Sequence, residues 1–582
     1  MREAVPTRHR VLVAAVLLVA AWAHFYVGGV SMERSRGWDE AMHAELPAAR
    51  MQLAAGRGDF GAAARVALDC QQYPPAYPAL VAAGYSITGV QEVWGRRFGR
   101  LLQALGLGGL FLLGRRLVRS WDPEGVWREA VPPAALLLGM LSPLWLAYSG
   151  TFFLEGPTLT VSIFTLLAWL GRDGRPSREL LAGSLATLAF FTKFNYALAL
   201  GAGLFVDLLL SGALELRAGR AAAFAKRAAL LAIPPVLGAL WWFVLPWPGD
   251  RALGAQHFEA FTAFLSGNQQ LAATPYDRRI WDAATFLFAG PLMALVVGIG
   301  LLLSLRFLRR PGVRTLWIVF LVSGLPVWLH NFHLDRFLLP AFAAALPLAG
   351  VGLARVFGPS RANFWFKPAL GIGLLLAAVF FASPTSNGFA RYLGLANEDN
   401  AAYVGQLHTE RLALLPARRL PTAGLERAAS DAFLEAIAGE LAATERVGWL
   451  GITSELSPGA LHLGLFERGA GADLDALALR LERDAPLVRE DGQPDMVVTF
   501  ESVDPGWDTA QIESWAAGFD LVLGTRPIDW KGRRGREFLE DYQVRLLEGG
   551  VWSATPIAEI PVARPIGEPT SVELFALRRK AE

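Results

Sequence analysis

Long apolar segments dominate this sequence and constrain its fold more than any other feature. The chain has 582 residues, of which 53% are hydrophobic and only 18% are charged. Its apolar residues gather in runs long enough to cross a bilayer as helices. Eleven runs are predicted as membrane spans: residues 11–30, 94–117, 131–147, 155–170, 180–191, 196–210, 228–245, 284–305, 315–329, 337–353 and 368–382. The sequence therefore predicts a polytopic α-helical membrane protein with about 11 transmembrane helices.

Two of these assignments have alternatives. Residues 11–30 follow a basic start, as a signal peptide would, but the run is long enough to span and lacks a clear small-residue cleavage site. We therefore predict a retained first helix. Residues 180–210 form either one long helix or two short helices separated at residues 192–195.

The distribution of basic residues favours two short helices. With that break, the segments predicted to face the cytoplasm carry 21 Lys and Arg residues, whereas the four outside loops after the first carry 5. A single long helix would invert the later loops and place the basic ones outside. We predict a multi-pass protein of the inner (plasma) membrane with a cytoplasmic N-terminus. Residues 31–92 and the tail from residue 383 then lie outside the cytoplasm.

The tail differs in kind from the rest of the chain. Its apolar runs have the length of strands, and amphipathic helical patterns lie between them. Strands are predicted at residues 447–452, 496–500, 521–523 and 572–576, and helices at residues 425–443 and 474–482. We therefore predict a transmembrane domain at residues 1–396 and an extracytoplasmic α/β domain at residues 397–582. The tail carries no recognisable site signature.

Composition excludes several classes of function. The net charge is only +2, so no basic field favours a nucleic-acid partner. Cys70 is the only cysteine, which excludes an intrachain disulfide and a cysteine-rich metal site. Gly106, Gly108 and Gly109 lie inside an apolar span, where small residues indicate close helix packing rather than phosphate binding.

The first outside loop contains the strongest candidates for chemistry. Asp39 and Glu40 follow the first span closely, where carboxylates cost desolvation energy unless they are paired or used. The alternative is a solvated loop. Alanine-rich amphipathic patterns at residues 44–55 and 61–68 predict short helices along the membrane surface. The loop then reaches a proline run at residues 73–78.

This arrangement resembles a known group of enzymes. A first helix, an outside loop that starts with Asp39-Glu40 and a closing Tyr-Pro-Pro-Ala-Tyr-Pro run are similar to the GT-C glycosyltransferases. The closest group is family 39 with its bacterial relatives, the protein O-mannosyltransferases and the lipid A aminoarabinose transferases. Further matches are Ser142-Pro143, Glu155, residues 191–193 and residues 335–340. The resemblance covers residues 11–382 and implies the GT-C fold.

The resemblance also implies an activity, namely inverting hexosyl or pentosyl transfer. The donor would be a polyprenyl-phosphate-linked sugar, and the acceptor would be a hydroxyl group outside the cytoplasm, on a lipid, glycan or protein that stays open. Asp39 would be the general base and Glu40 would orient the acceptor, although the two roles are interchangeable. Lys193 and Arg336 would bind the donor phosphate. The alternative for these two bases is snorkelling to lipid headgroups.

Other residues are secondary candidates. Glu155, Tyr73 and Tyr77 are predicted to contact acceptor or substrate, and Glu155 would alternatively be an ordinary acid at a helix N-terminus. His330 and His333 are weak candidates for a divalent metal, and the sequence requires no cofactor.

The motifs also depart from those of the relatives. This chain has Gln72-Tyr73 where the aminoarabinose transferases have Glu-Lys, and Arg336-Phe337 where Arg-Tyr is usual. A lysine contact to the donor phosphate is therefore missing, which indicates a different sugar or acceptor.

Two other classes of function compete with this interpretation. A transporter or flippase of lipid-linked sugars would explain broken helices and membrane acids, but such proteins place their charges near the midplane. A non-catalytic sensor with an outside domain would leave residues 39–78 without a role.

Overall fold

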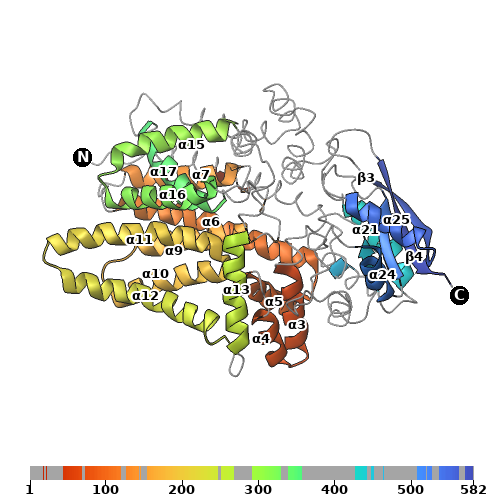
Figure 1. The fold of residues 1–582 in the computed structure, drawn as a ribbon. Coiled ribbons are helices and arrows are strands. Elements are labelled where there is room, and N and C mark those ends of the chain that lie inside the picture. Colours follow the sequence, from red (N-terminus) through yellow and green to blue (C-terminus); the bar gives the residue numbers. More distant parts are fainter. Residues whose placement is uncertain are drawn as a thin grey trace.

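A helical bundle and a smaller α/β unit make up the described part of the structure (Figure 1). The computed structural model describes residues 17–18, 21, 44–68, 73–119, 126–142, 145, 148, 152, 154–246, 251–267, 291–329, 339–356, 427–441, 447–450, 463–464, 508–519, 521–526, 537–562 and 570–580.

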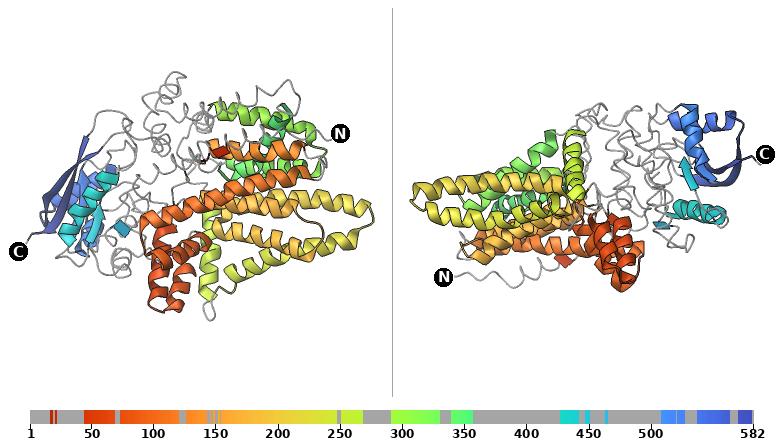
Figure 2. Two further views of the ribbon diagram at one scale, coloured as in Figure 1. Left: turned by 180° about the vertical axis from the view of Figure 1, so that it is seen from behind. Right: turned by 60° about the horizontal axis from the view of Figure 1, so that its bottom comes forward.

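Helices of two kinds build the bundle. One set of apolar helices runs side by side, and a second set runs across one end of them (Figures 1 and 2). The side-by-side helices are α6 (Glu92–Arg119), α7 (Val126–Leu141), α9 (Glu155–Leu170), α10 (Pro176–Thr192), α11 (Phe194–Arg217), α12 (Ala221–Phe243), α15 (Pro291–Ser304), followed by the 3-10 turn η4 (Leu305–Phe307), α16 (Pro311–Leu329) and α17 (Phe342–Val356). The crossing helices are α3 (Leu46–Gly56), α4 (Phe60–Leu68), α5 (Ala76–Thr88) and α13 (Arg251–Gly267).

The side-by-side helices overlap nine of the eleven predicted spans. The predicted span at residues 368–382 lies outside the described residues, as does most of the span at residues 11–30. Among the described helices, α6, α11 and α12 are long and apolar enough to cross a membrane. Shorter apolar stretches lie in α7, α9, α15, α16 and α17.

The predicted break between two short spans is confirmed. Helix α10 ends at Thr192 and α11 begins at Phe194, with Lys193 between them in an extended conformation (φ −160°, ψ 103°). The Lys193 amide donates to the carbonyl of Ala189 in α10, and its own carbonyl accepts from Ala197 in α11. One residue therefore closes one helix and opens the next, which places it at the junction of the two.

Small residues bring α6 and α9 together. A Cβ atom on Gly106 would lie 2.6 Å from the Thr160 hydroxyl, and one on Gly109 would lie 2.9 Å from Ile163. The close packing expected of these glycines is therefore confirmed, whereas Gly108 has nothing within 4 Å. The matching order of the contacts shows that α6 and α9 run parallel, so both begin at the same end of the bundle. We call this end, where the crossing helices lie, the site end.

The described part of the predicted first outside loop folds into helices, as its amphipathic patterns predict. Helices α3 and α4 have nearly the same bounds as the predicted helical segments at residues 44–55 and 61–68. Together with α5 they bury a small core that includes Tyr77, Tyr85 and Phe152. The position of these helices at a membrane surface stays a prediction.

The C-terminal unit is an α/β fold with its own hydrophobic core. A four-stranded sheet has the order β1-β2-β4-β3, in which β1 and β2 are parallel and the other pairs are antiparallel. Its core gathers aromatic residues such as Phe433, Trp515 and Phe575. The elements are α21 (Arg427–Leu441), β1 (Val447–Leu450), α24 (Thr509–Ala517), β2 (Leu521–Arg526), α25 (Glu537–Glu548), β3 (Trp552–Val562) and β4 (Thr570–Arg579). The predicted boundary at residues 396 and 397 lies outside the described residues.

Candidate active site

A buried ion pair joins two helix ends at the site end of the bundle. The Lys193 ammonium donates to Oε1 of Glu155 over 2.8 Å, and their side chains are 5% and 1% exposed. Glu155 is the first residue of α9, and Lys193 is the junction of α10 and α11. Because Lys193 is enclosed in this way, it does not extend to lipid headgroups, and the snorkelling alternative does not fit it.

Two tyrosines cover the lysine. The ring centroid of Tyr73 lies 4.9 Å from Lys193 Nζ, and that of Tyr196 lies 5.3 Å away. Both distances are within the range of cation–π attraction. Tyr73 comes from the proline run that precedes α5, so the structure joins the end of the first outside loop to Lys193. Of the predicted site residues, Lys193, Glu155 and Tyr73 are therefore brought together.

Tyr77 lies deeper, in the core of the crossing helices. It is 2% exposed and packs with Tyr85 and Phe152. The same core contains Leu154, the neighbour of Glu155 in the chain.

A second charged cluster lies nearby and was not identified from the sequence. Glu92 and Arg96, in the first turns of α6, form an ion pair at 2.7 Å, and the Arg96 side chain is fully buried. Tyr85 of α5 donates to the buried carboxylate of Glu45, at the start of α3, over 3.5 Å. The Glu92-to-Arg96 spacing of four residues is a helical pairing signal that could have identified the ion pair. The first contact lies within α6 and the second joins α5 to the start of α3, and a Cβ atom on Gly95 of α6 would lie 2.5 Å from the Tyr85 hydroxyl.

The opposite end of the bundle carries a different buried network. Asp207 of α11 accepts from Trp169 Nε1 at 2.9 Å and from the Thr315 hydroxyl at 2.7 Å. Arg172, in the loop after α9, lies 3.7 Å from Asp207 and 4.0 Å from Glu179. Burial lowers the pKa of Arg172 to about 10, against the opposing fields of Glu179 and Asp207.

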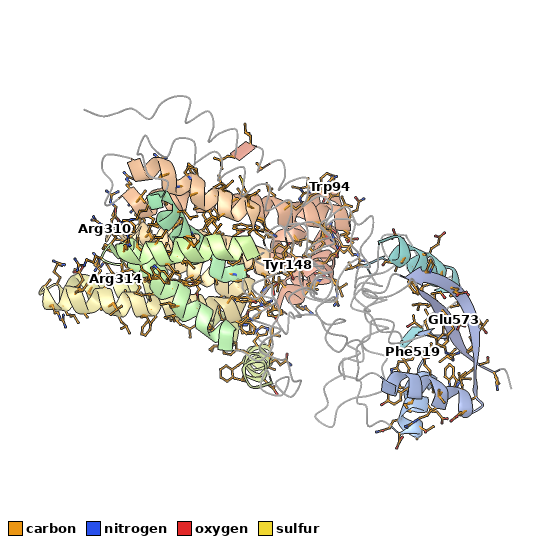
Figure 3. All side chains as sticks on the ribbon, turned by 90° about the horizontal axis from the view of Figure 1, so that it is seen from above. Trp94, Tyr148, Arg310, Arg314, Phe519 and Glu573 are labelled. Carbon is orange, nitrogen blue, oxygen red and sulfur yellow. The ribbon has the colours of Figure 1, made fainter. Side chains whose placement is uncertain are left out.

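Described basic residues from the loops predicted to face the cytoplasm lie at this opposite end. Arg116, in the last turn of α6, donates to the Leu170 carbonyl at the end of α9. Figure 3 shows Arg310 and Arg314 at one end of the bundle and Trp94, in the first turn of α6, near the other. These arginines lie at the end of the bundle where the predicted topology places the cytoplasmic loops. Which end faces the cytoplasm stays a prediction.

Five predicted site residues lie outside the described part of the structure: Asp39, Glu40, His330, His333 and Arg336. Their roles therefore stay predictions. Among the described residues, no group of three His, Cys, Asp or Glu side chains is arranged to hold a metal ion.

The described arrangement is suited to bind an anion beside a carboxylate. Its cation is the Lys193 ammonium, which is buried and donates to Glu155. Buried cations are far more effective at stabilising a nearby negative charge than exposed ones, because water does not screen them. Glu155 lowers the cost of keeping this cation buried.

The chain was compared with known proteins. No protein-family model matches it, and no curated protein is similar to it by sequence. Its structure is similar to that of ArnT from Cupriavidus metallidurans in the apo state, with a TM-score of 0.56 and 17% identity over 98% of each chain. The values are the same for ArnT from Cupriavidus metallidurans bound to undecaprenyl phosphate. The oligosaccharyltransferase AglB from Archaeoglobus fulgidus matches with a TM-score of 0.44 and 13% identity, over 89% of this chain and 70% of that chain.

The match to ArnT extends over nearly the whole length of both chains, so it includes the helical bundle, the crossing helices and the C-terminal unit. The apolar helices of the bundle agree with a membrane location. The prediction of a polytopic membrane fold with a C-terminal α/β unit is confirmed in its type, and the number of 11 transmembrane helices stays a prediction. The chain is a multi-pass membrane protein with the GT-C fold, which it shares with ArnT.

Proposed function

We propose that this chain is an integral-membrane glycosyltransferase that uses a polyprenyl-phosphate-linked sugar. The acceptor is a hydroxyl group on the outer face of the membrane. The fold shared with ArnT supports this proposal, and one of the similar structures is of ArnT bound to undecaprenyl phosphate. The observation that carries it is the buried Lys193–Glu155 pair under Tyr73, at the helix ends where a lipid phosphate would lie.

The reaction requires a base and a cation at fixed positions. The acceptor oxygen attacks the anomeric carbon and loses its proton, which we assign to the carboxylate of Asp39. The bond between the anomeric carbon and the phosphate oxygen breaks, and polyprenyl phosphate leaves with an additional negative charge. Lys193 and Arg336 stabilise that charge, and attack from the opposite face inverts the anomeric centre.

Glu155 has a supporting part in this scheme. Its carboxylate accepts a hydrogen bond from the Lys193 ammonium and fixes its position. Tyr73 occupies the position at which the aminoarabinose transferases carry lysine, and its ring covers the ammonium of Lys193. The donor phosphate would therefore be bound by Lys193, at the junction of α10 and α11, and not by a lysine at the position of Tyr73. The sugar-binding surface would then differ from that of the aminoarabinose transferases.

The test is a transfer assay with purified protein in lipid nanodiscs. A panel of polyprenyl-phosphate-linked hexoses and pentoses is supplied, and release of polyprenyl phosphate is measured beside the label in the acceptor fraction. We expect release with at least one donor, and loss of about 10²- to 10³-fold in Lys193→Met. Thr315→Val, which removes a buried hydrogen bond at the opposite end of the bundle, is the matched control and should retain turnover per folded molecule.

The same preparation separates the competing functions. A transporter or flippase would move the lipid-linked sugar between the leaflets of a vesicle and leave the bond to phosphate intact. Flipping without release from any donor would therefore overturn the proposal.

A further inference from the structure

His257 of α13 makes contacts that only a protonated ring can satisfy. Its Nδ1 lies 2.9 Å from the carbonyl oxygen of Trp242, and its Nε2 lies 2.6 Å from that of Leu68. A carbonyl oxygen accepts hydrogen bonds and never donates, so both ring nitrogens must carry a proton. The ring is 3% exposed, so water does not replace either partner readily. This geometry fits the imidazolium cation, in which both ring nitrogens donate.

The surroundings favour that cation. Leu68 is the last residue of α4, and Trp242 lies in the last turn of α12. Carbonyls at a helix C-terminus lack partners within the helix and carry the negative end of the helix dipole. In addition, the histidine ring stacks on the Trp242 ring at 3.9 Å, with 5° between the planes. A charged ring on an indole face gains cation–π attraction.

The same helix reaches the candidate active site. Phe261 follows His257 by one turn of α13, and its ring centroid lies 5.2 Å from that of Phe194, the residue after Lys193. The ring centroid of Phe194 in turn lies 5.8 Å from that of Tyr73, whose ring covers Lys193. Tyr73 also follows the end of α4 by only five residues. His257 therefore holds the end of α4, which precedes Tyr73 in the chain. Phe261 packs on Phe194, which in turn packs on Tyr73.

We propose that His257 is a positioning residue of the active site, an imidazolium that joins the ends of α4 and α12 and keeps Tyr73 over Lys193. The inference rests on the proposed glycosyltransferase function for its effect on turnover. Loss of the proton leaves one ring nitrogen with its lone pair facing a carbonyl oxygen, which opens one of the two contacts. Sugar transfer therefore depends on both ring nitrogens keeping their protons.

Other charged groups nearby do not account for such a response. On α4, Arg65 is exposed, and on α13, Glu259 is exposed. The bases of α12, Lys226 and Arg227, lie near its opposite end. In the described part of the chain no ion pair involves the ring of His257. Asp69, which follows Leu68, is outside the described residues, so Asp69→Asn belongs in the experiment.

The experiment measures the transfer rate against pH, from about 5.5 to 8.5. His257→Phe keeps a ring on Trp242 but has no donor, and His257→Lys keeps a cation. We expect His257→Phe to lose about 10- to 100-fold of the rate at the acid end and to lose the decline at alkaline pH. His257→Lys should recover part of the rate without the decline. Glu259→Gln is the matched control and should behave as the unchanged protein, and so should Asp69→Asn.

Hydrogen exchange of the peptide at residues 60–73, corrected for the intrinsic effect of pH, gives a readout that does not need activity. Protection should fall as pH rises in the unchanged protein and should be low at every pH in His257→Phe. If protection responds in this way but no donor is turned over, the contact stands and the glycosyltransferase proposal fails. If transfer is found and neither its alkaline decline nor the protection depends on His257, the positioning role is wrong. An alkaline decline that disappears in Asp69→Asn alone would also overturn it.

Discussion

Replacing both members of the Glu155–Lys193 pair separates a structural role from a catalytic one. Lys193→Met removes the ammonium that neutralises a carboxylate with 1% exposure. Breaking a buried pair from one side destabilises a protein by about 3–5 kcal/mol, because a buried charge loses its compensation. In Glu155→Gln the lysine keeps the faces of Tyr73 and Tyr196, each of which contributes about 0.5–2 kcal/mol. We therefore expect a smaller loss there, about 1–3 kcal/mol.

The double variant Glu155→Gln/Lys193→Met contains two neutral side chains of nearly the original shape. Neutral replacement of a buried ion pair is often without net cost, so its stability should return to within about 1 kcal/mol of the unchanged protein. Its turnover should not return. A phosphate that leaves without the Lys193 cation loses a fixed stabilising group, which corresponds to about 10²- to 10³-fold in rate.

The measurements are thermal unfolding in detergent and single-turnover transfer, made on all three variants. Thr315→Val provides the scale for a lost buried hydrogen bond, about 1–3 kcal/mol, at a position far from the pair. Recovery of both stability and turnover in the double variant would show that the pair only holds α9 to the junction of α10 and α11. A Lys193→Met variant that is stable and fully active would refute the reasoning as well.

Three further predictions concern residues outside the described part of the structure or the orientation of the chain. Asp39→Asn should lower single-turnover transfer by about 10²- to 10⁴-fold with donor affinity nearly unchanged, whereas Glu40→Gln should cost less, and the reverse order would exchange their roles. Arg336→Ala should lose turnover while the protein stays folded, and Arg336→Lys should restore only part of it, so unchanged turnover in Arg336→Ala would return this residue to snorkelling. A reporter fused after Ser383 should be active only outside the cytoplasm and one fused at Arg220 only inside, and the opposite pattern would contradict the topology.

The apolar pattern predicts the bundle well because membrane helices follow hydropathy. Even the junction at Lys193 was predicted, since the alternation of basic loops required it. The bounds of α11 were predicted less accurately, because the predicted span at residues 196–210 stops where the sequence becomes more polar. A helix continues through polar residues while its backbone bonds persist, and α11 reaches Arg217, close to the left-handed Gly219.

The C-terminal unit shows where local patterns are insufficient. Strand β3 was not predicted, and its Pro556 and Pro561 argue against a strand in the interior of a sheet. The order β1-β2-β4-β3 places it at the edge, where one side of the backbone needs no partner in the sheet, and proline is tolerated there. The helices α24 and α25 are short amphipathic segments whose packing partners are distant in the chain.

The candidate site was predicted only as separate residues. Lys193 and Glu155 were identified because each stands out at a predicted helix end, but the ion pair between them depends on tertiary packing. The contacts of His257 lie 15 and 189 residues away in the chain. Local patterns in a single sequence do not predict such contacts, because the contacts depend on how the helices pack against one another.

The network around Asp207 has a consequence for motion in this protein. Trp169 follows Glu155 in the chain by the same number of residues as Asp207 follows Lys193, a rise of about 21 Å along a helix. Helices α9 and α11 are thus fastened to each other at two levels, by the ion pair at the site end and by the indole–carboxylate hydrogen bond at the other. Neither helix can slide or rotate past the other without breaking both. Under the proposed function, α9 and α11 would therefore move as one rigid unit while the lipid donor enters and its product leaves.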